Sequence, residues 1–390
     1  MTSTPAGELV VPGPRGGALL APAPDPVIAG EKIVAEGAAA RPYFDRLDGL
    51  RAIAIGFVLV EHFAPVVGHQ ITAGYYGVDL FFVLSGFLIT NILLSTRKGF
   101  LRAYRDFVGR RTLRIFPIYY LTLGVLFVVG YQPCRDSILS LATYTYNYAW
   151  IHDRLTTSAL SHFWSLAVEE QFYLFWPVFI LAFRRRPRLL FAAIVAITGV
   201  CYFQLSTSWL APVAPYNFVG LFPRAGSLCL GALGSFLHRQ KRFLDVVLAR
   251  KWLEWLVVAA LIVTLLVHHK LMYVVMGLSS LYLVVKSAHS AFSLRWIEAF
   301  LTNKRVVTFG TLSYGIYVFH LPIGQLVVTR LVAPWWLPID FQSLGAFSFL
   351  KDCLWVVLLP TLSLLSYCVA DLSHEYIERP ILALKDQWFR

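Results

Sequence analysis

Long apolar segments separated by short polar loops make up most of the chain after about residue 40. Each segment is about as long as a helix that crosses a bilayer, which needs roughly 20 consecutive apolar residues. The pattern therefore predicts an all-α integral membrane protein, a polytopic bundle of about ten transmembrane helices. The expected spans are 50–67, 76–95, 115–131, 167–183, 189–206, 217–237, 252–268, 271–286, 306–330 and 352–372.

Composition supports a membrane protein over a soluble one. Apolar residues make up 57% of the chain and charged residues 14%, whereas a soluble domain carries about 25% charged residues. Residues 1–40 are rich in Pro, Ala and Gly, and their longest apolar stretch is too short for a signal-peptide core. We expect a flexible cytoplasmic tail over 1–40 and a transmembrane domain over 41–385.

The basic residues predict an orientation. If the N-terminus is cytoplasmic, 28 of the 34 Lys and Arg residues fall on the cytoplasmic side, as the positive-inside rule requires. Both termini are then cytoplasmic, and the protein lies in the cytoplasmic (inner) membrane. The net charge of +12 is spread over six juxtamembrane places without any recognition motif, which argues against nucleic-acid binding.

The most basic loop has two possible roles. Residues 100–115 alternate apolar with basic side chains, as expected of an interfacial helix. Arg110, Arg111 and Arg114 could bind a polyphosphate ligand, such as a nucleotide-bearing acyl donor, through charge-assisted hydrogen bonds. The positive-inside rule accounts for the same residues without a ligand.

Arg51 and His62 are ionisable residues in the first span, where such residues are costly and often functional. Because they are 11 residues apart, the two side chains lie on nearly the same face of the helix, separated by about 16 Å along its axis. His62 lies in the outer half, where an imidazole could take a proton from an alcohol and return it. It could alternatively form a hydrogen bond to a neighbouring helix, and Arg51 could be a topology anchor.

Three carboxylates are expected at or slightly outside the depth of His62. Asp79 opens the second span, and Glu169 and Glu170 open the fourth. They could orient the imidazole or bind an acceptor, but acidic side chains are also favoured at helix starts. His320, deep in the ninth span, could likewise have either a functional or a structural role.

Other catalytic patterns are missing from the sequence, including a GxSxG elbow, an HExxH zinc pair and a Walker loop. The five cysteines include no CxxC pair, so the cysteine pattern gives no indication of a metal site. A transporter of a sugar or lipid-linked intermediate is the alternative, with 220–223 (GLFP) as a possible break in a span. A receptor or scaffold is a third possibility, which would not need His62.

Seven sequence blocks resemble the acyltransferase-3 family of membrane O-acyltransferases. Its pattern of Arg and His separated by ten residues is met by Arg51 and His62. The blocks occur in order across 43–381, nearly the whole chain. They are 44–52 (FDRLDGLRA), 61–63 (EHF), 77–88 (GVDLFFVLSGFL), 110–117 (RRTLRIFP), 163–173 (FWSLAVEEQFY), 313–320 (SYGIYVFH) and 378–380 (ERP).

The resemblance implies roles for several residues. His62 would be the catalytic base or a transient acyl carrier, Arg51 would be needed on the same helix, and Arg111 and Arg114 would hold the donor. A donor with its phosphates among these arginines could extend its thioester arm along the first helix toward His62. Trp164, Ser85 and Tyr173 are candidates for stabilising the oxyanion, and they remain alternatives.

The resemblance also implies the reaction. Family members acylate envelope polysaccharides, peptidoglycan and secreted glycosylated molecules. We therefore expect transfer from cytoplasmic acyl-CoA, with acetyl-CoA as the expected donor, to a hydroxyl of a sugar or glycolipid acceptor. Some members carry an extracytoplasmic hydrolase-like domain that we expect this chain to lack. The membrane unit would then complete the reaction itself or pass the acyl group to a separate extracytoplasmic protein.

Overall fold

Helices account for every regular element in the part of the chain that the structure describes. The computed structural model describes residues 41–152, 159–207, 219–267, 271–336, 338–339 and 353–388. The tail expected over 1–40 lies outside these residues.

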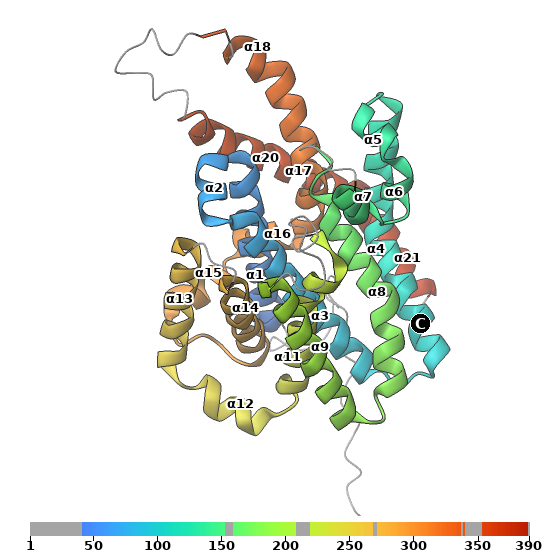
Figure 1. Ribbon diagram of the computed structural model, residues 1–390, viewed down its shortest axis with the longest axis vertical. Coiled ribbons are helices and arrows are strands. Elements are labelled where there is room, and N and C mark those ends of the chain that lie inside the picture. Colours follow the sequence, from blue (N-terminus) through green and yellow to red (C-terminus); the bar gives the residue numbers. More distant parts are fainter. Residues whose placement is uncertain are drawn as a thin grey trace, which may run out of the picture.

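Ten helices occupy the places of the ten predicted spans (Figure 1). They are α1 (Arg41–Phe63), α3 (Ala73–Ser95), α4 (Phe100–Val128), α8 (Phe163–Phe183), α9 (Pro187–Thr207), α11 (Leu221–His238), α13 (Lys251–Leu266), α14 (Met272–His289), α17 (Ser313–Val327) and α20 (Trp355–Ser373). Six of the described stretches are long and apolar enough to cross a membrane, and they comprise α3, α4, α8, α9, α17 with its extension to Trp336, and α20 with its extension to Leu384.

Shorter helices connect the long ones. They are α2 (Pro65–Ile71), α5 (Gln132–Asp136), α6 (Ile138–Ala142), α7 (Tyr146–His152), α12 (Lys241–Leu248), α15 (Arg295–Leu301), α16 (Lys304–Thr311), α18 (Ala333–Trp336) and α21 (Arg379–Trp388), with the π-helical turns η1 (Val328–Val332) and η3 (His374–Glu378).

One expectation about local structure is wrong. The segment 100–115 is not a separate interfacial helix, because it forms the first half of the continuous 29-residue helix α4. At the predicted break 220–223, Val219 is helical, Gly220 is extended, and α11 begins at Leu221 with Pro223 in its first turn. Proline is tolerated there because the first helical N–H groups have no partner within the helix.

Helix α3 lies at the centre, packed between α1 and α11. Its contact with α11 is close because the two helices meet at glycines. A Cβ atom on Gly86 would overlap the Leu228 carbonyl oxygen, and one on Gly231 would overlap that of Val83. Small residues let helix backbones approach closely, which is how membrane helices gain packing contacts in lipid.

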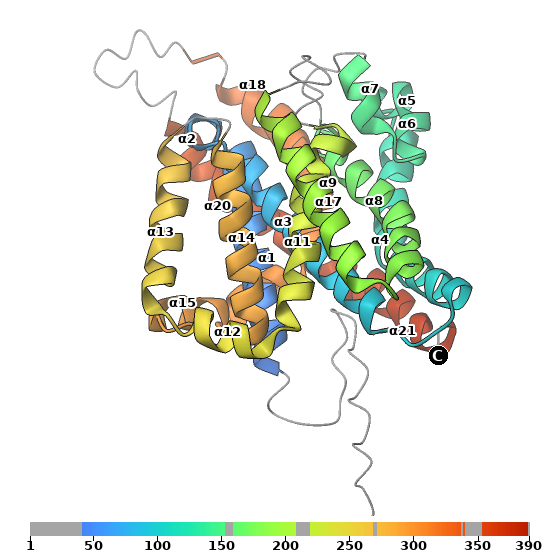
Figure 2. The same ribbon diagram turned by 60° about the horizontal axis from the view of Figure 1, so that its bottom comes forward.

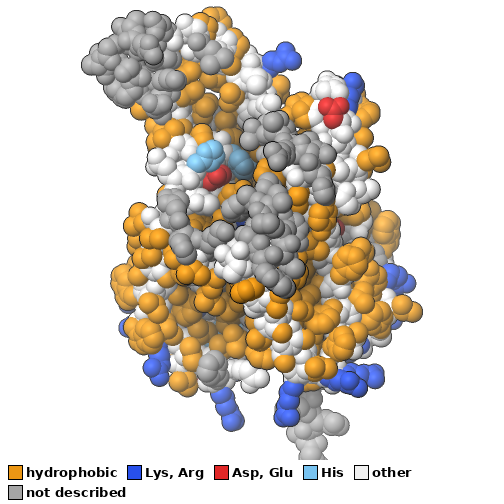
Figure 3. Space-filling view, in the orientation of Figure 1, with side chains coloured by type: hydrophobic (Ala, Val, Ile, Leu, Met, Phe, Trp, Pro, Cys, Tyr) orange, Lys and Arg blue, Asp and Glu red, His pale blue; other side chains and the backbone are white. Residues whose placement is uncertain are grey.

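The two ends of the bundle differ in charge. Helices α12, α15 and α21 lie at the end where α1 begins, and α2, α5, α6, α7 and α18 lie at the other (Figure 2). The face drawn in Figure 3 carries Lys and Arg around the first of these ends, below a broad band of hydrophobic side chains. We call these two ends the basic end and the opposite end.

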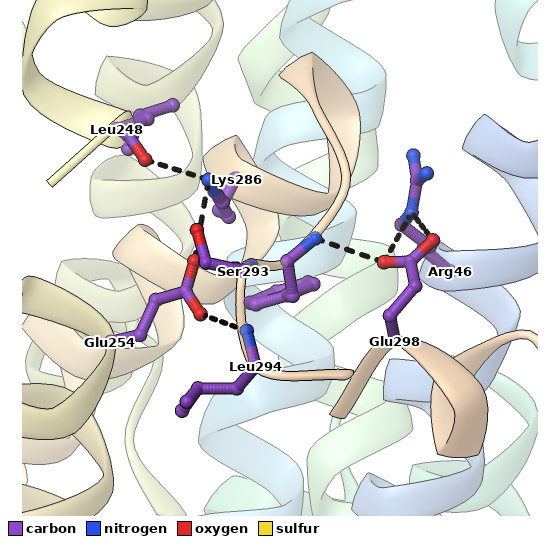
Figure 4. A network of polar contacts seen from close by, with 8 residues as sticks. Arg46, Leu248, Glu254, Lys286, Ser293, Leu294 and Glu298 are labelled. Atoms are coloured by element: carbon purple, nitrogen blue, oxygen red, sulfur yellow. Dashed lines mark hydrogen bonds and ion pairs between the residues drawn. The ribbon is translucent and has the colours of Figure 1, made fainter. Parts of the chain in front are cut away.

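Two carboxylates hold the loop between α14 and α15 at the basic end (Figure 4). Glu254 on α13 accepts hydrogen bonds from the backbone N–H groups of Ser293 at 2.8 Å and Leu294 at 2.9 Å. Glu298 accepts from the N–H of Phe292 at 3.0 Å and from Arg46 Nε at 2.8 Å. The loop therefore ties α13 and α15 to the start of α1.

Candidate active site

Arg51 and His62 belong to one unbroken helix, as predicted. Helix α1 runs from Arg41 to Phe63 and starts at the basic end. Arg51 forms an ion pair with Asp48, one turn earlier. The two side chains therefore lie at different depths, with Arg51 nearer the basic end and His62 nearer the opposite end.

Three histidines from different parts of the chain meet at the end of α1. His62 Nδ1 lies 3.0 Å from Nε2 of His320 on α17. The His320 ring lies 4.8 Å, between centroids, from the ring of His162, which immediately precedes α8. His320 and His162 are both buried. The structure thus brings His62 against His320 of a neighbouring helix, which was one of the two possibilities that the sequence left open, the other being an orienting carboxylate.

His162 differs from its neighbours in its hydrogen bonding. Within the described part of the chain, neither of its ring nitrogens forms a hydrogen bond. Its backbone carbonyl accepts from Tyr317 Oη at 2.9 Å and from Ser165 Oγ at 3.2 Å. The Ser165 and Tyr317 hydroxyls lie 2.6 Å apart. These contacts join the start of α8 to α17 directly beside the histidines.

A cavity extends from the arginines to this Ser165–Tyr317 pair. Its empty volume, including the part open to solvent, is about 820 Å³. Arg51 and Arg111 lie on helices that begin at the basic end, and Ser165 lies near the start of α8, which begins at the opposite end. The polar lining residues are Arg51, Ser85, Arg111, Arg114, Ser165, Glu169, Tyr173, Ser313, Tyr314 and Tyr317.

Of the three arginines predicted to hold the donor, Arg111 and Arg114 line the cavity. Arg110 is not among its described lining residues. The Arg111 guanidinium lies 5.0 Å from the centre of the Tyr173 ring and 5.9 Å from that of Phe107. These cation–π contacts hold the arginine in place while leaving its N–H groups able to bind an anion.

Glu169, Ser85 and Tyr173 form one hydrogen-bonded group in the middle of the cavity. The Glu169 carboxylate accepts from both hydroxyls, and Ser85 Oγ lies 2.9 Å from Tyr173 Oη. Glu170 is not a cavity-lining residue in the described part of the chain, and its Oε1 atom is buried without a hydrogen bond there. The two adjacent glutamates therefore occupy different surroundings.

Asp79 has a structural partner. It is buried on α3, and its Oδ1 atom accepts from Nη1 of Arg224 at 3.0 Å and from Ser227 Oγ at 3.1 Å. Arg224 is fully buried in the first turn of α11. No described hydrogen bond joins Asp79 to the histidines.

Aromatic rings surround the Arg224 guanidinium. It lies between 5.3 and 5.6 Å from the ring centres of Tyr75, Trp164 and Tyr273. Trp164 is thus part of this cage. Tyr144 and Tyr146 are buried in the core. Their rings fill space between helices because α5, α6 and α7 fold back over α4 and α8.

Sequence reasoning missed His162, Arg224, Ser165 and Tyr317. Arg224 had a usable signal, because it is the one basic residue inside the apolar stretch 217–237 and an intramembrane charge calls for a partner. His162 precedes the block 163–173 in a polar loop, where nothing in the sequence indicates burial. Tyr317 and Ser165 look like ordinary span residues.

Comparison with known proteins gives several curated relatives. The chain is 29% identical to the peptidoglycan O-acetyltransferase OatA of Listeria monocytogenes, over 87% of this chain and 56% of the relative. It is 28% identical to the putative peptidoglycan O-acetyltransferase YrhL of Bacillus subtilis, over 89% and 56%. It is 24% identical to the O-acetyltransferase OatA of Staphylococcus aureus, over 87% and 57%. No solved structure matches the chain.

The chain spans about half the length of these curated relatives. Within it, residues 44–369 match the model of the acyltransferase domain of the acyltransferase-3 family. This range begins just before Arg51 and covers the histidine cluster and the whole cavity. The chain therefore belongs to the acyltransferase-3 family of membrane proteins.

Proposed function

We propose that the protein is an O-acetyltransferase of the cytoplasmic membrane, which moves an acetyl group from acetyl-CoA to a hydroxyl of an envelope polysaccharide. The acceptor class follows from the relatives, which are named as peptidoglycan O-acetyltransferases. The observation that supports the proposal best is the cavity, which carries arginines at one depth and, at another, ends at Ser165 and Tyr317, whose hydroxyls contact the backbone carbonyl of His162.

The basic part of the cavity suits the donor. Coenzyme A carries phosphates, and Arg51, Arg111 and Arg114 converge on one space. Arginine binds phosphate oxygens through paired, charge-assisted hydrogen bonds. With the phosphates held there, the thioester arm extends past the Glu169 group toward Ser165 and Tyr317. Both termini are proposed to be cytoplasmic, so the donor enters from the basic end.

The histidine cluster beside the Ser165–Tyr317 part of the cavity suits acyl transfer. His62 takes the proton of the acceptor hydroxyl, the hydroxyl oxygen attacks the thioester carbonyl, and the C–S bond breaks. The imidazolium then returns the proton to the departing thiolate. In the alternative sequence of steps, a nitrogen of His62 attacks the thioester carbonyl, the C–S bond breaks and the CoA thiolate leaves. The acceptor hydroxyl then attacks the acetylated His62, the bond from nitrogen to the acetyl carbon breaks, and the hydroxyl proton goes to the thiolate. Both sequences of steps need a reactive nitrogen on His62.

A radiolabel experiment tests this function. Membranes containing wild-type protein and radiolabelled acetyl-CoA are expected to place alkali-labile label in the peptidoglycan or polysaccharide fraction. His62→Gln is expected to abolish this label. His289→Gln is the matched control, because His289 binds Asp245 at the basic end, away from the cavity. Label that persists in His62→Gln would contradict the mechanism, and no label with verified donor and acceptor would favour the transporter alternative.

The donor site has its own test in two adjacent residues of α4. Arg111→Ala is expected to raise the KM for acetyl-CoA about 10-fold or more, because hydrogen bonds to charged groups contribute roughly 1.5–3 kcal/mol. Arg110→Ala removes the same charge from the same helix outside the cavity lining, so its KM is expected to change little. Equal effects of the two substitutions would contradict the proposed donor site.

A further inference from the structure

His320 interacts with two groups, and together they limit where its hydrogen can be. Its Nδ1 atom lies 2.7 Å from the backbone carbonyl oxygen of Tyr317, and its Nε2 atom lies 3.0 Å from Nδ1 of His62. A carbonyl oxygen only accepts, so the hydrogen of His320 must be on Nδ1. The Nε2 atom of a neutral His320 then carries a lone pair.

His320 is best described as neutral because it is fully buried. A buried charge is costly unless it is paired. In the described part of the chain the groups around its ring are His62, His162, Tyr317 and Phe63, and none is a carboxylate. An imidazolium here would have no counter-ion.

From this geometry we infer that His320 is a positioning residue, which fixes His62 in the tautomer with the hydrogen on Nδ1. The lone pair of His320 Nε2 accepts that hydrogen, and His62 Nε2 is left unprotonated. The inference rests on the proposed function and adds to it the reacting atom. Nε2 of His62 takes the proton of the acceptor hydroxyl, or attacks the thioester carbon in the carrier route, while Nδ1–H remains bonded to His320.

This arrangement has a chemical consequence. A histidine base works when one ring nitrogen is held by an orienting partner and the other faces the substrate. When His62 Nε2 gains a proton, the positive charge of the ring is shared with Nδ1–H, which already donates to His320. The Tyr317 carbonyl stabilises the same charge through His320, because the three groups form one hydrogen-bonded chain.

A direct test of the tautomer uses nitrogen NMR spectra of the full chain in lipid with isotope-labelled histidine. The His62 signals are assigned as those lost in His62→Gln. We expect a protonated Nδ1 and an unprotonated Nε2 in the wild type. A protonated Nε2, or a ring protonated on both nitrogens at neutral pH, would overturn the inference.

Variants at His320 test its role in turnover. Leucine removes both hydrogen bonds, so His320→Leu is expected to lower kcat by about 100-fold or more, as when the residue orienting a catalytic histidine is replaced, with KM for acetyl-CoA unchanged. Glutamine can accept from His62 through its carbonyl and donate to Tyr317 through its amide, so His320→Gln is expected to stay within about 10-fold of wild type. Equal loss in both variants with the wild-type tautomer retained would overturn the positioning role.

The experiments distinguish an incorrect role for His320 from an incorrect proposed function. If His62→Gln keeps activity, the proposed mechanism fails whatever the tautomer of His62. If His62→Gln is inactive but His62 carries its hydrogen on Nε2, the function stands and the role of His320 fails. Since the NMR measurement uses the wild-type chain, it does not depend on whether His320→Leu folds.

Discussion

Individual buried side chains determine much of this protein's polar chemistry, and the Asp79–Arg224 pair is the clearest example. Both residues are almost completely shielded, with exposures of 1% and 0%. The carboxylate receives hydrogen bonds from Arg224 and Ser227, and the guanidinium is surrounded by aromatic rings. Each charge thus has partners that offset part of its desolvation cost, although buried pairs do not always stabilise a fold.

Removing one charge of this pair is expected to destabilise the bundle. Asp79→Leu leaves the Arg224 charge buried without its carboxylate, which costs about 3–5 kcal/mol. The double variant Asp79→Leu with Arg224→Met is expected to recover most of that loss, because it leaves neither charge behind. Thermal unfolding in detergent measures both.

Activity of the double variant decides between two roles for Asp79. A folded and active double variant means that Asp79 acts through structure. A folded but inactive one would support the catalytic role predicted from the sequence. A single variant as stable as wild type would contradict the importance of the ion pair.

At the scale of helices, the close contact of α3 with α11 holds the site together. Helix α3 carries Ser85 and Asp79, and α11 carries Arg224. The glycines Gly86 and Gly231 allow the backbones to touch, since any side chain there would overlap a carbonyl oxygen of the other helix. The close contact of the two helices keeps Asp79 beside Arg224 and holds α3, which forms one wall of the cavity, in place.

A bulky residue at this contact is expected to separate the helices. Gly231→Val is expected to lower the stability of the bundle by about 1–3 kcal/mol, the usual cost of overpacking, and to reduce acetyl transfer. Gly199→Val in α9 is the matched control, because it introduces the same residue into a helix where a Cβ meets nothing within 4 Å. Equal unfolding temperatures for the two variants would contradict the packing argument.

At the scale of the whole molecule, the unequal charge of the two ends is the main feature. Helices α12, α15 and α21 lie at one end (Figure 2), and the face drawn in Figure 3 carries most of its Lys and Arg side chains toward that end. The positive-inside rule places such an end in the cytoplasm. With that orientation, the arginine-lined part of the cavity lies nearer the cytoplasm and the histidine cluster nearer the outer surface.

Single cysteines test this orientation. In a variant whose five cysteines are replaced by alanine, Asp136→Cys puts an exposed thiol at the opposite end and Arg185→Cys puts one at the basic end. A membrane-impermeant maleimide added to intact cells is expected to label Asp136→Cys, and to label Arg185→Cys only after lysis. The reverse pattern would invert the proposed orientation and the direction of donor entry.

The sequence by itself determined the membrane class, the places of the long helices and the family. The length of the apolar segments indicates the first two directly, because a bilayer requires about 20 apolar residues per crossing. The family is indicated by the seven sequence blocks. It also determined that Arg51 and His62 share one helix, because helical geometry is a local property of the chain. The extent of α4 was mistaken because a basic segment and an apolar one can continue as a single helix.

Only the tertiary structure decided which side chains meet. His62 and His320 are 258 residues apart in sequence, and Asp79 and Arg224 are 145 apart. Their contacts depend on how α1, α3, α11 and α17 pack, which no local pattern encodes. For the same reason, the burial of His162 appears only in the folded bundle. So does the difference between Arg111, which lines the cavity, and Arg110, which is not among its described lining residues. Hydrophobic length determines that a helix crosses the membrane, but packing determines which of its faces meets which neighbour.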